Sequence, residues 1–220
     1  MAAPKSFLLT PELSEYLVGH ARPVDAVQEW LIGETAALGP IAGMQVAPEQ
    51  GAFLTIFAAA VGARSAIEIG TFTGYSSLCL ARGLGPEGRL ICCDVSEEWT
   101  ALAREAWTRA GVADRVDLRI APATDTIAAL PEGPQFDLAF IDADKPGYWG
   151  YFDALVPRMR PGACILVDNV LWSGRVIDAA VTDDDTRAIR DFNDRVATDP
   201  RVEVVMLPVA DGLTIARVLP

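Results

Sequence analysis

The chain has 220 residues, of which 51% are hydrophobic and 22% are charged. This length and composition predict a single globular domain over residues 1–220. The formal net charge of −12 argues against nucleic acid and anionic membrane surfaces as partners, because both carry negative charge. Its apolar stretches are too short for a membrane span or a signal peptide, so we expect a cytoplasmic protein.

Histidine and cysteine chemistry is not expected to carry the function. His20 is the one histidine, and we expect it to be structural or on the surface. The cysteines lie in apolar runs without a Cys-x-x-Cys pair, so they are expected to be reduced core residues. They are Cys79, Cys92, Cys93 and Cys164. A catalytic base is then expected from a carboxylate, a lysine or a metal-bound group.

The first part of the chain reads as helical. Apolar spacing predicts helices at residues 11–19, 24–38 and 48–61, and it indicates packing on a sheet rather than a separate domain. Residues 1–64 are therefore expected to form a helical cap on a sheet core of residues 65–220. The sequence leaves open whether this cap is purely structural or closes over a ligand at the carboxyl edge of the sheet.

From residue 65 onward, short β-rich runs alternate with helices, which is typical of a doubly wound parallel sheet. Strands are predicted at residues 65–70, 89–95, 116–121, 136–142 and 164–168, with helices at 75–83, 97–110, 124–130 and 148–159. After a helix at about 183–198, runs at 202–208 and 213–218 predict a closing hairpin. The expected fold class is α/β, with a Rossmann-like, mostly parallel seven-stranded sheet, a C-terminal hairpin and an N-terminal helical cap.

The first strand runs through a glycine-bearing turn into a helix, which is the geometry of a nucleotide site. Glu68 lies between two isoleucines, so its burial requires donors from backbone amides or a ligand. The spacing of Gly70 and Gly74 is not GxGxxG, which favours a nucleoside ligand without a pyrophosphate. Asp94 ends the second strand, where an acidic residue meets a ribose hydroxyl. The alternative is that Asp94 caps the next helix, a role for which Ser96 competes.

The fourth and fifth predicted strands also end in polar residues. Asp142 follows one strand, and Asp168 and Asn169 follow the other. Because the ends of neighbouring parallel strands meet at one edge, these side chains are expected to converge. Oxygen ligands without sulfur or imidazole suit a hard divalent cation, Mg²⁺ first, with Mn²⁺ or Ca²⁺ as alternatives. The alternative to a metal site is that these residues only cap helices and form turns.

Lys145 is one of two lysines in a chain with sixteen arginines. Lysine can release its proton when burial or a nearby cation lowers its pKa, whereas arginine cannot. A lysine three residues after Asp142 is therefore placed for general-base work, and a surface position is the alternative. The aromatic side chains of Tyr148, Trp149 and Trp172 are expected either to hold an aromatic ring or to belong to the core.

Four motifs in one order resemble a known family. They are Met44-Gln45-Val46, Glu68-Ile69-Gly70-Thr71-Phe72-Thr73-Gly74-Tyr75-Ser76, Asp142-Ala143-Asp144-Lys145 and Asp168-Asn169-Val170-Leu171-Trp172. Together they resemble the cation-dependent class I O-methyltransferases, the caffeoyl-CoA and catechol O-methyltransferase group. Ser173 departs from the plant caffeoyl-CoA enzymes, which usually carry Asn at that position, and this weakens the case for a CoA ester.

The resemblance implies S-adenosylmethionine as the cofactor, a small catechol-like substrate and a homodimer. The residues it implies for cofactor binding are Val46, Glu68, Gly70, Tyr75, Ser76, Asp94, Ala123, Asp142 and Asp144. It implies Asp142, Asp168 and Asn169 as ligands of the divalent cation, and Lys145 as the base, with Asp142 also catalytic. A divalent cation on the acceptor oxygen would lower the pKa of that hydroxyl, so that the oxygen can attack the methyl group.

Other functions remain as alternatives. A methyltransferase could act on another small acceptor, although the charge argues against RNA as the acceptor. A Rossmann-type NAD(P)-dependent oxidoreductase would share the sheet, but the chain has no Tyr-x-x-x-Lys and its glycine loop has the wrong spacing. A sensor that binds an adenosyl ligand without catalysis is the third alternative.

Overall fold

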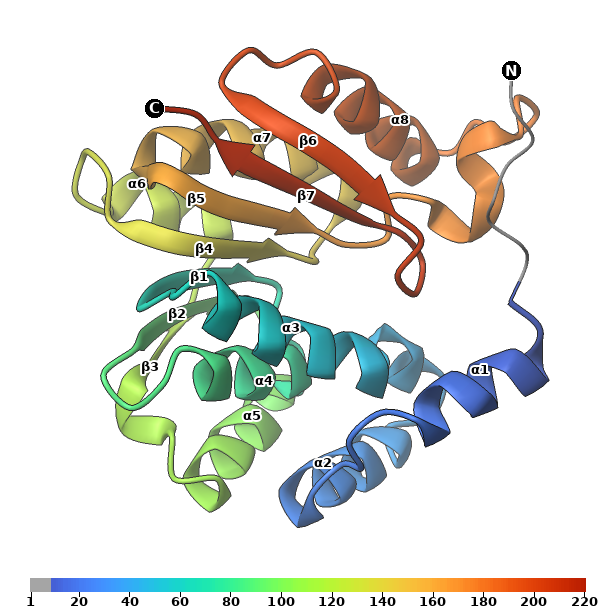
Figure 1. The fold of residues 1–220 in the computed structure, drawn as a ribbon, viewed down its shortest axis with the longest axis vertical. Helices are drawn as coiled ribbons and strands as arrows, with labels where there is room; N and C mark the ends of the chain where they lie inside the picture. Colours follow the sequence, from blue (N-terminus) through green and yellow to red (C-terminus); the bar gives the residue numbers. More distant parts are fainter. Residues whose placement is uncertain (1–8) are drawn as a thin grey trace.

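A central sheet of seven strands organises the molecule (Figure 1), and the computed structural model describes residues 9–220. The strand order is β3-β2-β1-β4-β5-β7-β6. Neighbouring strands from β3 to β5 run parallel, and β7 pairs antiparallel with both β5 and β6. The strands are β1 Ser65–Ile69, β2 Arg89–Asp94, β3 Val116–Ile120, β4 Phe136–Ile141, β5 Met159–Val167, β6 Val202–Leu207 and β7 Leu213–Val218. The predicted fold class is confirmed.

Helices cover both faces of the sheet (Figure 1). The α-helices are α1 Pro11–Gly19, α2 Ala26–Ala36, α3 Pro48–Ala60, α4 Tyr75–Gly83, α5 Glu97–Arg109, α6 Ala123–Ala129, α7 Tyr148–Leu155 and α8 Asp184–Val196. Short 3₁₀ turns join them: η1 Gly39–Met44, η2 Ala113–Arg115, η3 Lys145–Gly147, η4 Val156–Arg158 and η5 Trp172–Ile177. Among the described residues, no helix is long and apolar enough to cross a bilayer.

The alternation of side chains along the strands builds two cores, one on each face of the sheet. On β4, Leu138 and Phe140 pack with the helices α2 to α5, whereas Ala139 and Ile141 pack with α6 to α8. Residues 138–141 of this strand are all apolar because helices cover both sides. The four cysteines are buried and free, as predicted.

The N-terminal helices add a layer over α4 and α5. Asp25 caps α2 through a capping box with Gln28, so this helix begins at Ala26 rather than at residue 24. α3 lies against α4 at Gly51, where a Cβ would be 2.6 Å from Tyr75 Cε1 and 2.9 Å from Cys79 Sγ. Leaving out a side chain at this position is therefore what lets α3 approach α4 so closely.

The fifth strand differs from its prediction. β5 begins at Met159, five residues before the expected start, and its pairing with β4 shifts between the Phe136–Met159 and Leu138–Cys164 pairs. The turn-like sequence Arg160-Pro161-Gly162 therefore forms an irregularity inside the strand instead of a break before it. Proline and glycine do not fit regular strand pairing, so the extra residues of β5 form a β-bulge.

Candidate active site

A cavity of about 880 Å³ opens at the carboxyl ends of the parallel strands. It lies where the strand order reverses between β1 and β4, the point at which open α/β sheets bind ligands. Its walls come from segments far apart in the chain: residues 43–47 and 50, the ends of β1 to β5, Trp172, Asp185, and the β6–β7 turn at 210–211. The N-terminal helical region therefore both packs on the sheet and lines this cavity.

The cavity wall carries strained backbone. In residues 9–220, the non-glycine residues with positive φ are Phe72, Asn169, Trp172, Ser173 and Ala210. All of them except Ser173 line the cavity. Left-handed backbone at non-glycine residues costs about 1–3 kcal/mol each and gathers at functional sites.

The turn after β1 depends on Gly70, which has φ +90°. A Cβ at this residue would lie 2.0 Å from the carbonyl oxygen of Asp142 on the neighbouring strand end. Gly70 therefore lets the turn lie directly against the residue that follows β4. This close approach brings the first and fourth strand ends to one wall of the cavity.

Asp94 holds that same turn. Its Oδ2 accepts hydrogen bonds from the backbone N–H groups of Thr71 at 3.0 Å and Phe72 at 2.7 Å, and its Oδ1 accepts from Ser96 N at 2.8 Å. Ser96 itself caps α5, with Oγ accepting from Trp99 N at 3.1 Å. Asp94 is thus not the cap of that helix, and its half-buried carboxylate is left at the cavity wall beside a fixed turn.

Glu68 lies behind the cavity rather than in its wall. It is fully buried, and neither carboxyl oxygen has a hydrogen-bond partner within the described part of the chain. Burial raises the pKa of Glu68 to about 7, and the nearby Ser76 and Thr71 hydroxyls oppose that rise. The expected backbone donors are absent among residues 9–220, so the neutral acid is the form this site favours.

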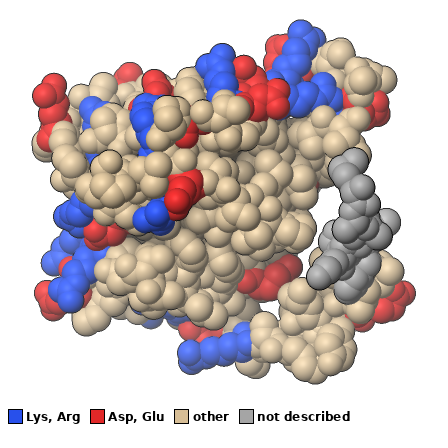
Figure 2. Space-filling view, turned by 45° about the horizontal axis from the view of Figure 1, so that its top comes forward, with Lys and Arg blue, Asp and Glu red and all other residues tan. Residues whose placement is uncertain are grey.

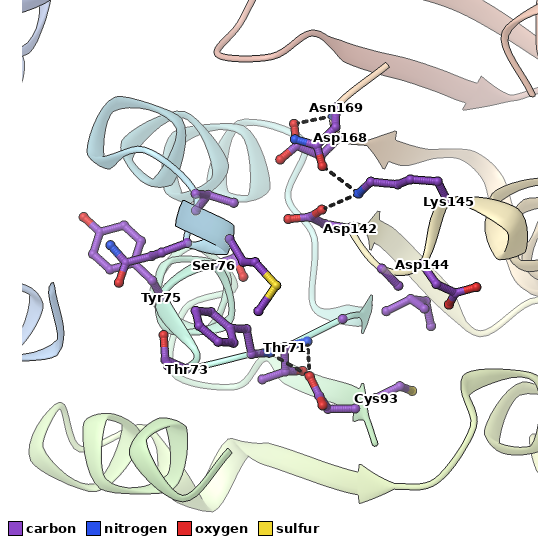
Figure 3. A pocket seen from close by; sticks show the side chains of 18 of the residues that line it. Thr71, Thr73, Tyr75, Ser76, Cys93, Asp142, Asp144, Lys145, Asp168 and Asn169 are labelled. Carbon is purple, nitrogen blue, oxygen red and sulfur yellow. Dashed lines mark hydrogen bonds and ion pairs between the residues drawn. The ribbon is translucent and has the colours of Figure 1, made fainter. Parts of the chain in front are cut away.

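Oxygen ligands converge at the other end of the cavity. Figure 3 shows Asp142, Asp168 and Asn169 around the ammonium group of Lys145. Lys145 Nζ donates to Asn169 Oδ1 at 2.7 Å, Asp142 Oδ1 at 3.2 Å and the hydroxyl of Tyr148 at 2.6 Å. Lys145 is itself buried, so this arrangement fixes the amine in the cavity wall.

The donor set at this end fits a hard divalent cation. Burial and the adjacent Asp142 carboxylate both raise the pKa of Asp168, and burial raises that of Asp142 against the opposing effect of Lys145. A buried carboxylate (Asp168) and a partly buried one (Asp142) that repel each other gain from a shared cation. The set is two carboxylates and one amide, and no group of three or more His, Cys, Asp or Glu residues suited to a metal lies within residues 9–220. The ligand roles of Asp142, Asp168 and Asn169 stay predictions.

The structure gathers nearly all the predicted site residues in this one cavity. Those that line it are Val46, Gly70, Tyr75, Ser76, Asp94, Ala123, Asp142, Asp144, Lys145, Asp168 and Asn169. Glu68 is the exception, since its side chain lies on the α4 face of β1, beneath the wall. The individual roles of these residues remain predictions.

Two of the three aromatic side chains, for which the sequence left both ring binding and a core role open, lie outside the cavity. Tyr148 is fully buried beneath Lys145, and its hydroxyl donates to the carbonyl of Asp168 at 3.0 Å. Trp149 packs against Phe152 and under the guanidinium of Arg195, outside the cavity. Consecutive residues on a helix point about 100° apart, so only one of this pair can face the strand ends. Trp172 lines the cavity, in keeping with the first of those two roles.

Sequence reasoning missed several lining residues. Trp99 and Phe72 form an edge-to-face pair at 5.3 Å on the wall near Asp94. The Ser96-x-x-Trp99 helix start was a usable signal, since the first turn after a strand lies at the carboxyl edge. Gln50 and Asp185 had no local signal, because they reach the cavity only through the packing of α3 and α8.

Comparison with known proteins assigns the chain to a family. The family model described as O-methyltransferase matches residues 24–219. The chain belongs to this O-methyltransferase family. It is 39% identical over 204 residues to a probable caffeoyl-CoA O-methyltransferase 1 of Dictyostelium discoideum, covering 91% of this chain and 89% of the relative.

Comparison with solved structures supports the same family assignment. An O-methyltransferase from Bacillus cereus in complex with SAH is 36% identical, with a TM-score of 0.85, and the match covers 94% of this chain and 97% of that one. The O-methyltransferase TomG from Streptomyces achromogenes, in complex with SAM, is 30% identical, with a TM-score of 0.86 and coverage of 95% and 96%. This member of the family is therefore an S-adenosylmethionine-dependent O-methyltransferase, and methyl transfer is favoured over the oxidoreductase alternative.

Proposed function

We propose that this methyltransferase acts on one hydroxyl of a small catechol-like substrate and requires a divalent cation. The observation that carries the proposal is the convergence of Asp142, Asp168 and Asn169 beside Lys145, in the same cavity as the Asp94 turn. A catechol presents two adjacent oxygens, which suits a hard cation that binds through oxygen.

The methyl donor fits the cavity in charge and in polarity. Its sulfonium group is positive, and the cavity is lined by Asp94, Asp142, Asp144, Asp168, Asp185 and Asp211, with Lys145 as the one basic side chain among the described lining residues. Ala121, Pro122 and Ala123 supply an apolar wall of the kind a nucleobase contacts. The Asp94 carboxylate lies at the wall between these groups, where a ribose hydroxyl would donate to it.

The reaction moves one methyl group and one proton. The acceptor oxygen forms a bond to the methyl carbon as the carbon–sulfur bond breaks, and that electron pair stays on sulfur as a neutral thioether. Asp142, Asp168 and Asn169 would hold the cation, which supplies a lower pKa for the acceptor hydroxyl. As a neutral amine, Lys145 Nζ would donate its two N–H groups to Tyr148 and Asn169 and keep its lone pair for the hydroxyl proton.

The charges of the cavity also restrict the acceptor. Asp185 and Asp211 are the lining carboxylates that the cofactor and cation assignments leave unused. No lysine or arginine other than Lys145 faces the cavity in the described chain, so a polyphosphate group such as that of a CoA ester meets no countercharge there. A neutral or cationic catechol is therefore the acceptor class that we propose, in contrast to the relatives named for caffeoyl-CoA.

Transfer of a labelled methyl group from S-adenosylmethionine tests this proposal. We expect product with 4-methylcatechol, much less with the monohydroxy analogue 4-methylphenol, and a lower kcat/KM for caffeoyl-CoA than for the neutral catechol. Calorimetry with and without EDTA should give the same S-adenosylmethionine affinity, since Asp94 and the cation ligands lie at different strand ends. Equal turnover of 4-methylphenol and 4-methylcatechol would show that the acceptor class is wrong.

A further inference from the structure

Gln50 interrupts an otherwise apolar side of α3. Residues 50, 54 and 58 lie on one side of this helix, and both Leu54 and Ala58 are fully buried in the core. Gln50 is also buried, with 1% of its surface exposed, but it lines the cavity. A leucine here would continue the apolar stripe, so packing alone does not call for an amide at this position.

The Gln50 amide has no partner to justify its burial. Its Nε2 makes no hydrogen bond with any described residue. Burying an amide donor without a partner costs roughly 1–3 kcal/mol. Gln50 lines the cavity, so an oxygen of a bound ligand is a candidate acceptor for this donor.

The packing of α3 against α4 fixes the position of the Gln50 side chain. Gly51, the next residue, lies against Tyr75 and Cys79 of α4, which fixes the first turn of α3. The Gln50 side chain lies beside the Asp168 carboxyl, although the geometry of the pair does not meet the criteria for a hydrogen bond. Gln50 is therefore at the end of the cavity that holds Asp168, away from the Asp94 turn.

We infer that Gln50 is a further acceptor-binding residue, whose buried side-chain amide donates a hydrogen bond to an oxygen of the bound catechol. The inference rests on the proposed function, and it assigns the N-terminal helical region a part in acceptor recognition. Loss of the donor should weaken acceptor binding and loosen the choice between the two hydroxyl groups, while the cofactor end of the cavity stays intact.

The test compares Gln50→Leu with Gln135→Leu as a matched control. Gln135 lies outside the cavity, where its Nε2 donates to the carbonyl of Pro131. For Gln50→Leu we expect the KM for 4-methylcatechol to rise about 3- to 10-fold, the value of one hydrogen bond. The ratio of the two monomethyl products should shift, the S-adenosylmethionine affinity should not change, and Tm should be equal or higher because an unpaired donor is gone. The control should keep the wild-type KM and product ratio.

The outcomes separate the two claims. A KM and a product ratio within twofold of wild type in a folded Gln50→Leu protein would overturn the inference and leave the proposed function standing. A lowered Tm together with weakened S-adenosylmethionine binding would show a structural role instead, and would also overturn it. Wild-type protein that methylates no catechol would overturn the proposed function, and the inference with it.

Discussion

The Nζ of Lys145 lies within hydrogen-bond distance of three oxygens, those of Asp142, Tyr148 and Asn169, and in its neutral form it would donate to two of them and keep a lone pair. Two of these belong to predicted cation ligands, so the amine and the cation share partners. Tyr148, which the sequence left between substrate binding and the core, turns out to support Lys145 from below. A buried lysine in such a fixed position, a few ångströms from the cation ligands, suits proton transfer from a bound hydroxyl.

Replacing Lys145 tests its role as the base. Lys145→Ala should keep S-adenosylmethionine binding but lose about 10²- to 10⁴-fold in kcat, the usual cost of removing a general base. Activity should recover in part at higher pH, as solvent base takes over, and Lys145→Arg should recover little because guanidinium does not accept the proton. Steady-state kinetics across pH measure this, and a kcat within threefold of wild type in Lys145→Ala would remove Lys145 from the mechanism.

Glu68 makes a prediction about stability. Its pKa is raised by burial to about 7 from 4.5, and the groups facing it include Thr71, Ser76, Cys92 and Asp142. At a pH between these two pKa values, Glu68 keeps its proton in the folded chain but has lost it in the unfolded chain. Stability from this group is therefore complete below about pH 4.5 and is lost as the pH rises toward 7.

Glu68→Gln, which stays neutral, should consequently unfold at a higher Tm than wild type at pH 8 and at nearly the same Tm at pH 4.5. The expected gain at pH 8 is on the order of 1–3 kcal/mol. Thermal denaturation of the cofactor-free protein at both pH values measures it. A Tm difference that does not change with pH would mean that Glu68 is paired in the folded chain.

At the scale of elements, the approach of α3 to α4 shapes one wall of the site. Gly51→Ala would place a methyl group 2.6 Å from the Tyr75 ring and force the two helices apart. We expect a loss of about 1–3 kcal/mol in the free energy of unfolding, typical of overpacking, together with weaker S-adenosylmethionine binding. Gly33→Ala in α2 is the matched control, since its Cβ meets nothing within 4 Å and alanine favours the helix by about 0.5–1 kcal/mol. Equal stability in the two variants would contradict this account of the helix contact.

Much of the element order was readable from the sequence, because hydrophobic runs and turn residues are local signals. β1, α4 and β7 begin where they were predicted. β5 was not, since Pro161 and Gly162 normally end a strand, and only pairing with β4 shows that the chain resumes beyond a bulge. The site residues also divide into those with a local sequence signal and those without one. Strand-end carboxylates such as Asp142 were found from the pattern, whereas the cavity position of Gln50 depends on helix packing that no local pattern reports.

At the scale of the whole molecule, the exposed apolar surface indicates how copies of the chain associate. Charged side chains of both signs lie mostly near the periphery of the face in Figure 2, with broad areas free of them. α1 buries none of its residues within the chain and exposes Leu13, Tyr16, Leu17 and Val18. Such an apolar surface favours association, and we expect a homodimer. Sedimentation should show twice the 23.5 kDa chain mass, and a 23.5 kDa species at micromolar concentration would contradict this expectation.

The central claim is that the oxygens of Asp142, Asp168 and Asn169 hold a divalent cation that methyl transfer requires. The most direct measurement is turnover of 4-methylcatechol after exhaustive chelation, in wild type, in Asp168→Ala and in a control, Asp194→Ala, which changes an exposed residue of α8 outside the cavity. We expect chelation to abolish turnover, and Mg²⁺ or Mn²⁺ to restore it in wild type and in Asp194→Ala but not in Asp168→Ala, with S-adenosylmethionine affinity preserved in all three. Full activity that survives both chelation and Asp168→Ala would contradict the claim.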